Sequence, residues 1–254
     1  MTNDSSATPP PGDDLPVDPA SAADCKGDAE LSNPLAGENV EDPSPTLEAA
    51  LERYQLETPP EAIEPLKAYC ALLWEWNLKL NLTRHTDYDK FVSRDLLDVL
   101  QLASVLNEGE EVLDVGSGGG VPGIPLAIVR PDLRVSLCES IGKKAKVLGE
   151  MTNALEIQVP VFHGRAEVVL DDFSFDSLAA RAVGPLWKML HWFQGRWHTI
   201  GRLLAIKGPS WPEERGEARH RGYMHEVDLR KLVEYPRPGA DGQSVILQLT
   251  QKGR

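Results

Sequence analysis

The sequence of 254 residues is poor in cysteine, and its three cysteines, Cys25, Cys70 and Cys138, follow no ligand or disulfide spacing. An odd, scattered set predicts neither a disulfide framework nor a zinc site, and we expect a cytoplasmic protein without a metal. Residues 1–11 contain no basic region and no apolar core, so they do not indicate a signal peptide. No run of 18 apolar residues occurs, and we expect no membrane partner.

Basic residues are also scarce, with 26 lysines and arginines against 39 acidic residues. Such an excess of acid argues against a nucleic-acid partner only if the charge is evenly spread. Residues 1–45 alone hold ten acidic residues, one lysine, eight prolines and no aromatic residue. A segment of this composition cannot bury enough apolar surface to offset its ordering entropy, so we predict a disordered, acidic, Pro-rich tail over 1–45. The rest of the chain is only mildly acidic.

Two kinds of pattern follow the tail. Residues 46–108 carry apolar side chains at helical spacing and predict an N-terminal helical cap. From residue 109 to 254, strand and helix patterns alternate, which predicts a doubly wound α/β domain with a mostly parallel seven-stranded sheet. The last two strands have no helix between them and should form an antiparallel hairpin. The predicted strands cover 112–115, 134–138, 158–162, 175–180, 202–206, 223–235 and 244–250, and the predicted helices cover 47–56, 61–80, 89–106, 123–129, 143–154, 166–170, 185–197 and 211–219.

The domain is organised around a glycine loop that follows its first strand, with the pattern D-x-G-x-G-x-G from Asp114 through Gly116 and Gly118 to Gly120. A dinucleotide fingerprint would need glycine where Val121 stands, and no lysine follows as in a phosphate-binding P-loop. The acid before the glycines suits a cationic or hydroxyl-bearing ligand better than a pyrophosphate. S-adenosylmethionine, with its ammonium and sulfonium groups, fits. The alternative is a tight strand–helix turn that holds no ligand.

Further polar residues follow the other strands at the same predicted edge of the sheet. Glu139 ends the second strand, where an acid can accept both ribose hydroxyls of a nucleoside, although a surface acid is the alternative. Arg165, Ala166 and Glu167 follow the third strand, where an adenine ring could lie; a first-turn acid at a helix N-terminus is the alternative. Arg181 follows the fourth strand, and its guanidinium can bind a phosphate, a carboxylate or a nucleobase edge, or form a structural ion pair.

The stretch from Leu113 to Leu126 closely resembles the glycine loop of the bacterial small-subunit (16S) ribosomal RNA guanine-N7 methyltransferases, also called glucose-inhibited division protein B or methyltransferase G. The resemblance covers about residues 50–250 and implies a class I methyltransferase with a Rossmann-like fold. Other blocks that agree in order and spacing are Trp76-Asn77, Asn81-Leu82-Thr83, Ser140-Ile141-Gly142-Lys143-Lys144, Arg165-Ala166-Glu167, Arg181-Ala182 and Lys207-Gly208.

The resemblance implies S-adenosylmethionine as cofactor, methyl transfer to N7 of a guanine, and 16S ribosomal RNA or the small ribosomal subunit as partner. It implies cofactor contacts at Gly116, Val121, Ala166, Glu167 and Arg181. Guanine N7 carries a lone pair and no proton, so a general base is not required. We therefore expect catalysis by orientation and electrostatics, with Arg181 as the positioning residue.

One departure from the family pattern lies in the third predicted helix. The family usually has Arg-His before the Asp-Ser of the third helix, whereas this chain has Asp95 and Val99 in place of the His and the Ser. Two alternatives stay open: a methyltransferase of the same fold that acts on another RNA or a small molecule, and a nucleotide-binding regulatory module without catalysis.

The residues assigned to RNA are Arg84, Lys143, Lys144, Arg165 and Lys207.

Overall fold

The computed structural model describes residues 42–253. The predicted disordered tail therefore falls mostly on residues 1–41, which lie outside the described residues. The described chain begins just before a capped helix, in which the Thr46 side chain accepts a hydrogen bond from the Ala49 N–H at 3.2 Å. The division into a tail, a helical cap and a methyltransferase domain remains a prediction.

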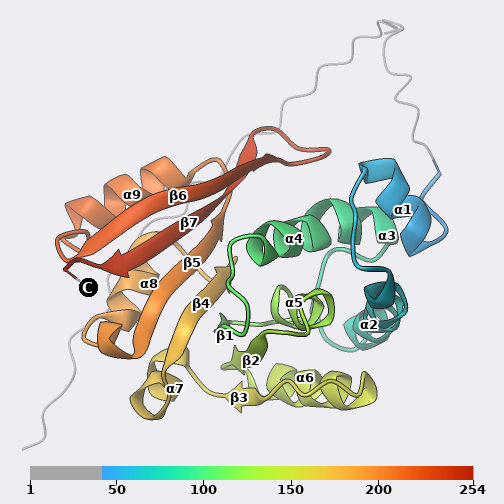
Figure 1. Cartoon of the computed structure of the whole chain (residues 1–254), viewed down its shortest axis with the longest axis horizontal. Helices are drawn as coiled ribbons and strands as arrows, with labels where there is room; N and C mark the ends of the chain where they lie inside the picture. Colours follow the sequence, from blue (N-terminus) through green and yellow to red (C-terminus); the bar gives the residue numbers. More distant parts are fainter. Residues whose placement is uncertain (1–41, 254) are drawn as a thin grey trace, which may run out of the picture. The chain divides into compact units, whose positions relative to one another are not determined.

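The sheet has the order β3-β2-β1-β4-β5-β7-β6 (Figure 1). The first five strands along the chain pair in parallel, and the last two form an antiparallel hairpin whose second strand pairs with β5. The predicted α/β, doubly wound, mostly parallel seven-stranded sheet is confirmed. The strands are β1 (Glu111–Val115), β2 (Arg134–Glu139), β3 (Val161–His163), β4 (Phe175–Arg181), β5 (Ile200–Lys207), β6 (Val227–Pro236) and β7 (Gln243–Gln251).

Helices cover both faces of the sheet, with α1, α2 and α4–α6 on one face and α7–α9 on the other (Figure 1). The chain order of the strands explains this, since right-handed crossovers on the two sides of β1 place their helices on opposite faces. The helical elements are α1 (Leu47–Tyr54), η1 (Pro60–Ala62), α2 (Ile63–Asn77), α3 (Tyr88–Lys90), η2 (Phe91–Leu96), α4 (Leu97–Ala103), α5 (Gly123–Val129), α6 (Gly142–Ala154), α7 (Ala166–Asp172), α8 (Leu186–Phe193), η3 (Trp197–Thr199) and α9 (Trp211–His220).

Strand residues alternate between two apolar cores, as the two-residue period of a strand requires. Val112 and Leu204 face the core shared with α1, α2 and α4–α6, while their neighbours Leu113 and Leu203 face the core shared with α7–α9. All four side chains are fully buried. The N-terminal helices therefore pack directly on the sheet that carries the glycine loop.

Several predicted boundaries differ from the structure, and the sixth strand begins at Val227 rather than 223. The third strand begins at Val161 rather than 158, because Pro160 has no N–H for the ladder and offers only its carbonyl to Leu137. Helix α8 ends at Phe193 rather than 197, since Gly195 turns the chain at φ 81°. The predicted helix over 89–106 contains a π-helical stretch, η2, before α4.

Candidate functional site

The glycine loop joins β1 to α5 in a conformation that only glycine adopts readily. Gly116, Gly118 and Gly120 have φ of 70°, 57° and 99°, in the left-handed region. A Cβ at Gly120 would also lie 2.7 Å from the Ile124 side chain. Backbone conformation therefore favours glycine at all three positions, and close packing adds to this preference at Gly120.

Hydrogen bonds fasten this loop to the end of β2. The Ser117 hydroxyl accepts from the Cys138 N–H at 3.2 Å, and the Ser117 N–H donates to the Cys138 carbonyl at 3.1 Å. Glu139 accepts from the Gly118 N–H at 2.9 Å and, with its other oxygen, from the Ile141 N–H at 2.8 Å. The carboxylate predicted to meet a ribose is therefore already fixed beside the loop, with lone pairs left to accept further hydrogen bonds.

Asp114 lies beneath the loop with only 1% of its surface exposed. One carboxyl oxygen accepts from the Gly123 N–H at 3.1 Å, and the other has no hydrogen-bond partner among the described residues. Burial raises the pKa of the Asp114 carboxyl to about 7, although the nearby Ser117 hydroxyl and the Gly123 N–H oppose the shift. A positive charge held above the loop would stabilise its ionised form.

A cavity of about 290 Å³ opens beside the glycine loop at the carboxyl edge of the sheet, and we call it the loop cavity. It brings together three predicted cofactor residues from the ends of two strands, Gly116 after β1 and Ala166 and Glu167 after β3. Arg165 also lines it, and Val183 and Trp192 supply apolar walls. The other predicted cofactor residues do not line this cavity: Asp114, Gly118, Gly120, Val121 and Glu139 form the loop and its supports, and Arg181 lies elsewhere.

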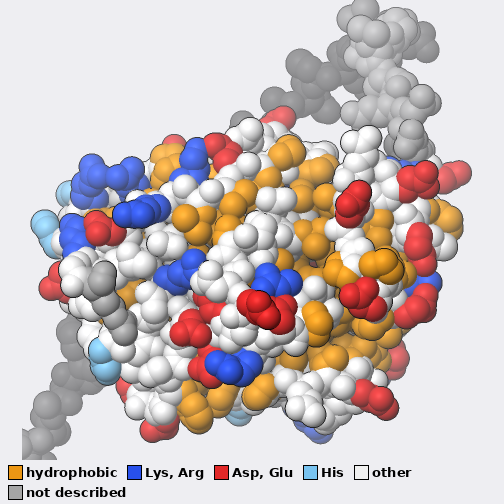
Figure 2. All heavy atoms as spheres, in the orientation of Figure 1, with side chains coloured by type: hydrophobic (Ala, Val, Ile, Leu, Met, Phe, Trp, Pro, Cys, Tyr) orange, Lys and Arg blue, Asp and Glu red, His pale blue; other side chains and the backbone are white. Residues whose placement is uncertain are grey.

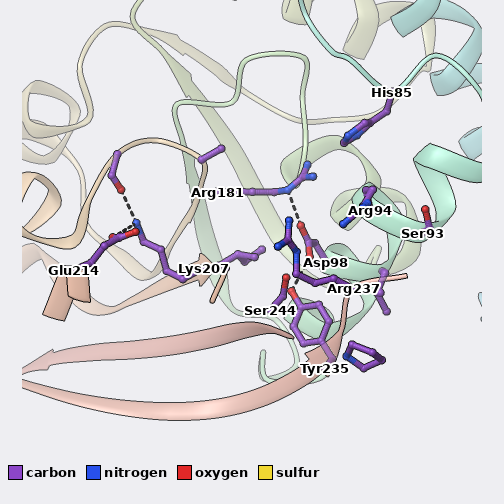
Figure 3. Close-up of a pocket in the computed structure, with 16 residues that line it drawn as sticks. His85, Ser93, Arg94, Asp98, Arg181, Lys207, Glu214, Tyr235, Arg237 and Ser244 are labelled. Carbon is purple, nitrogen blue, oxygen red and sulfur yellow. Dashed lines mark hydrogen bonds and ion pairs between the residues drawn. The ribbon is translucent and has the colours of Figure 1, made fainter. Parts of the chain in front are cut away.

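A second cavity of about 540 Å³, which we call the charged cavity, also borders the segment that follows β4, and Figure 3 shows residues that line it. Arg181, Ala182 and Gly184 line the charged cavity, whereas Val183 between them lines the loop cavity. The segment 181–184 is therefore a shared wall. Ligands bound in the two cavities would both lie beside this segment.

Arg181 is held by two carboxylates from the segment that enters α4. Its Nε donates to Asp98 at 2.7 Å and its Nη2 donates to Asp95 at 2.6 Å. Burial disfavours the charged form of Arg181 and so lowers the pKa of its guanidinium. The two aspartates together have the larger effect, and the net pKa is raised. Burial chiefly raises the pKa of Asp98, against the effect of Arg181. The ion-pair alternative for Arg181 is thus realised, and the same contacts hold the side chain at the cavity wall.

The departure at residue 95 has a structural explanation. The Asp95 oxygen that accepts from Arg181 also lies 2.8 Å from Nδ1 of His85, which comes from the loop after α2. The His85 imidazole therefore lies beside residue 95, where the family pattern has a histidine, but it comes from the loop after α2. The other Asp95 oxygen is buried without a hydrogen-bond partner among the described residues. Val99 is fully buried in the apolar core, so this departure leaves no polar group that needs a hydrogen-bond partner.

The five residues assigned to RNA do not form one surface in the structure. Lys207 lines the charged cavity, but its ammonium donates to Glu214 at 2.7 Å and to the Gly184 carbonyl, and only 9% of its side chain is exposed. These contacts count against a direct role in RNA binding. Arg84 and Lys143 are exposed and Lys144 is half-buried. Arg165 is 77% exposed at the rim of the loop cavity.

Sequence reasoning missed several residues of the charged cavity. Tyr235, on β6, donates its hydroxyl to Asp98 at 2.7 Å and is nearly buried. His85, Arg94 and Arg237 also line the cavity and come from three separate segments. The only available signal was the Arg94–Val99 stretch, which differs from the family pattern. No local pattern could have joined residues so far apart in sequence.

Two further searches of residues 42–253 gave negative results. No helix there is both long and apolar enough to cross a bilayer. No group of three or more His, Cys, Asp or Glu side chains gathers there as a metal site would require. The predictions about metal and membrane partners remain predictions.

Known proteins resemble this chain in sequence. A family model described as "GidB: rRNA small subunit methyltransferase G" matches residues 62–238. A protein of Rhodopirellula baltica named ribosomal RNA small subunit methyltransferase G is 50% identical over 190 residues, which are 75% of this chain and 82% of that protein. A protein of the same name from Marinobacter nauticus is 38% identical over 192 residues, which are 75% of this chain and 87% of that protein.

Solved structures resemble the chain at the level of the fold. The 23S rRNA methyltransferase ErmE has a TM-score of 0.46 at 17% identity, covering 63% of this chain and 70% of that chain. TrmK of M. capricolum, in complex with S-adenosyl-homocysteine, has a TM-score of 0.47 at 12% identity, covering 61% of this chain and 67% of that chain. The assignment rests on the family model and the sequence relatives. The glycine loop and the strand ends around it agree with the family model and the sequence relatives, and the chain belongs to the GidB family of small-subunit ribosomal RNA methyltransferases.

Proposed function

We propose that this chain transfers a methyl group from S-adenosylmethionine to N7 of a guanine in 16S ribosomal RNA. The observation that supports this most is the pair of cavities that share the wall at residues 181–184, one beside the glycine loop and one lined by charged side chains. Two cavities that border the same short segment can hold a donor and an acceptor near each other, and a methyltransferase needs the two close together and in line. Membership of the family supports 16S RNA as the substrate and, with it, a cytoplasmic location.

The residues of the loop cavity fit S-adenosylmethionine. Gly116 leaves room for a ligand against the backbone, and Glu139 stands at the end of β2, where ribose hydroxyls can donate to it. Ala166 and Glu167 would border the adenine. The buried Asp114, with one oxygen unpartnered, would be stabilised in its ionised form by the positive charge of the cofactor. Gly118, Gly120 and Val121 act by shaping and supporting the loop rather than by lining the cavity.

The side chains around the charged cavity support methyl transfer without moving a proton. When bound, S-adenosylmethionine supplies a sulfonium methyl group, whose C–S bond breaks as the N7 lone pair forms the new C–N bond. The guanine thereby gains a positive charge. The carboxyl groups of Asp95 and Asp98, which pair with Arg181, lie beside the wall where this charge would develop and would offset it. Arg181 acts as a positioning residue that holds both carboxylates in place.

The outer surface gives the RNA a direction of approach. On the face drawn in Figure 2, lysines and arginines gather over α9 and β6, while acidic side chains gather over α1 and α2. Arg219, Arg221 and Arg230 are exposed members of the first group. Electrostatics favour an RNA that contacts the α9–β6 side and extends over the charged cavity. We assign methyl transfer to residues 109–254 and part of the cofactor-site support to the cap, residues 46–108.

The proposal is tested with ribosomal RNA from cells that lack this modification. Purified protein, labelled S-adenosylmethionine and small subunits or naked 16S RNA are incubated, and N7-methylguanosine is located by chemical cleavage at that base. We expect one strong site in 16S RNA. Label in another RNA only, or in no RNA while a small molecule is methylated, would replace the substrate assignment.

A matched pair of glycine variants tests the loop cavity. Gly116→Val adds a Cβ 3.2 Å from the Val183 side chain at a residue with φ of 70°, whereas Gly149, in α6, has open space for a side chain. We expect titration calorimetry to show loss of S-adenosylmethionine binding in Gly116→Val and little change in Gly149→Val. Equal affinity in the two variants would mean that the loop is only a turn.

A further inference from the structure

The charged cavity contains two arginines that no acidic side chain neutralises. Arg94 makes no side-chain hydrogen bond or ion pair with any of residues 42–253. Arg237 donates only one long hydrogen bond, at 3.5 Å, to the Asp241 carbonyl in its own turn. Guanidinium groups in a protein remain charged, so the cavity holds two positive charges without counter-charge.

The other charged side chains that line the cavity are compensated within the protein. Arg181 is paired with Asp95 and Asp98, and Lys207 is paired with Glu214. The free positive charge is therefore confined to Arg94 and Arg237. A ligand of this cavity should bring an anionic group to them, since neutralising both arginines would be favourable.

The two arginines stand on different walls of the cavity. Arg94 belongs to η2, just before α4, and Arg237 follows β6 in the turn to β7. Figure 3 shows both guanidinium groups within the cavity, in the neighbourhood of the Arg181–Asp98 pair. Pro236 and Pro238 flank Arg237 and restrict its backbone, which lowers the entropy cost of holding it there. Two guanidinium forks that face one cavity match the oxygens of a phosphodiester.

We propose that Arg94 and Arg237 clamp the backbone phosphate next to the target guanosine and so seat its base against the wall at residues 181–184. This inference rests on the proposed function and adds the way in which the RNA is held. A volume of about 540 Å³ lies in the range of ligand sites for molecules of nucleotide size. A base in a stacked helix cannot enter such a cavity, so the guanosine must leave its stack, and the clamp holds it in that state.

The test uses the full-length protein and its RNA substrate. Arg94→Gln, Arg237→Gln and the double variant are compared with Arg134→Gln, which removes the same charge at the opposite edge of the sheet, where Arg134 is 67% exposed. We expect KM for RNA to rise about tenfold for each cavity arginine, as loss of a charge-assisted hydrogen bond implies. We expect kcat at saturating RNA to change by less than about threefold, because the contact is made equally before and during the reaction.

Salt dependence gives a second readout that a structural role would not move. Each lost phosphate contact should reduce the slope of log affinity against log salt by about 0.7, the value for single-stranded nucleic acid. Arg94→Lys and Arg237→Lys keep the charge and should keep the slope, with weaker affinity. S-adenosylmethionine affinity, measured by calorimetry, should be unchanged in all variants.

Three results would overturn the clamp. The first is that Arg94→Gln and Arg237→Gln have the same KM for RNA, and the same slope of log affinity against log salt, as Arg134→Gln. Another is a fall in kcat with KM unchanged, which would place the arginines in the chemical step. The third is a reduced slope of log affinity against log salt in Arg94→Lys and Arg237→Lys, although these variants keep the positive charge. The wild-type protein separates this failure from that of the proposed function, since a wild type that methylates 16S RNA leaves only the clamp in question.

Discussion

Each edge of the sheet buries an arginine among carboxylates, and the two networks differ in what they leave unpaired. At the carboxyl edge, Arg181 is 19% exposed and pairs with Asp95 and Asp98. At the amino edge, Arg202 is 18% exposed and donates to both oxygens of Glu110 at 2.9 Å. The two arginines therefore have the same charge, nearly the same exposure and the same type of partner.

The amino-edge network is closed. Arg202 also donates to the Ser177 hydroxyl at 2.8 Å and to the Val105 carbonyl at 2.9 Å, and Glu110 accepts in addition from the Ser177 hydroxyl and from Asn107. At the carboxyl edge, by contrast, buried oxygens of Asp95 and Asp114 have no hydrogen-bond partner among the described residues. Unsatisfied buried polar atoms need an explanation, and a ligand site supplies one. A buried ion pair by itself does not identify a site.

The largest expected effect separates the two arginines by activity. Arg181→Gln and Arg202→Gln should each lower the free energy of unfolding by about 3–5 kcal/mol, because each leaves buried carboxylate unpaired. Only Arg181→Gln should also lower kcat, by about 100-fold, since the acceptor wall loses its geometry. Thermal unfolding and turnover at saturating substrate, measured where circular dichroism shows both variants folded, provide the check.

The milder Arg181→Lys and Arg202→Lys serve if the glutamine variants do not fold. A lysine keeps the charge but loses the forked contacts, so the kcat of Arg181→Lys should still fall well below that of Arg202→Lys. Equal kcat in the two would show that the carboxyl-edge network is as purely structural as the amino-edge one.

An intermediate effect concerns the unsatisfied carboxyl of Asp114. Its pKa in the folded protein is raised from 3.8 to about 7, so the unfolded chain ionises first as pH increases. This contribution to stability is fully present below about pH 4 and is lost as pH rises through about 7. Without cofactor, Asp114→Asn should match wild type at pH 4 and be more stable by about 2–4 kcal/mol at pH 8. Urea unfolding across this range gives the curves, and a constant difference between them would contradict the assignment.

The smallest effect compares one hydroxyl from each network. Tyr235→Phe removes the hydrogen bond to Asp98, and Ser177→Ala removes the hydrogen bond to Glu110. Each should cost about 1 kcal/mol, the net value of an ordinary hydrogen bond, or somewhat more because the acceptor is a carboxylate. Only Tyr235→Phe should raise the pKa of Asp98 further, because it removes a donor that favours the ionised form. Thermal shift and NMR titration of the carboxyl carbons measure the two effects, and an unchanged Asp98 titration in Tyr235→Phe would be the unfavourable result.

The parts of the site that lie close together in sequence were predictable. The spacing of Asp114 and the glycines fixes a strand, a left-handed turn and a helix within a dozen residues, and the structure has all three. Glu139 and Arg181 were expected at strand ends on the carboxyl edge, and both lie there. Alternating strand and helix patterns leave few other places for them, because parallel strands end on one edge.

The charged cavity was not predictable, because its members are joined only by the tertiary fold. Arg181 is separated from Asp98 by 83 residues, and Asp98 is separated from Tyr235 by 137. Nothing in the local sequence of Tyr235 or Arg237 distinguishes them from other hairpin residues. Lys207 shows the converse limit, since its place in a family block indicated RNA, whereas the fold pairs its ammonium with Glu214 and the Gly184 carbonyl.

One contact between the cap and the glycine loop bears on how the chain can be divided. The Tyr69 hydroxyl, fully buried in α2, donates to the Gly119 carbonyl at 2.9 Å. A polypeptide started at residue 109 would therefore lose both a loop anchor and the covering of one apolar core. We expect such a truncated chain to aggregate rather than bind cofactor weakly. The cap is thus not an interchangeable module, and substitutions in α2 and in the loop should be inherited together.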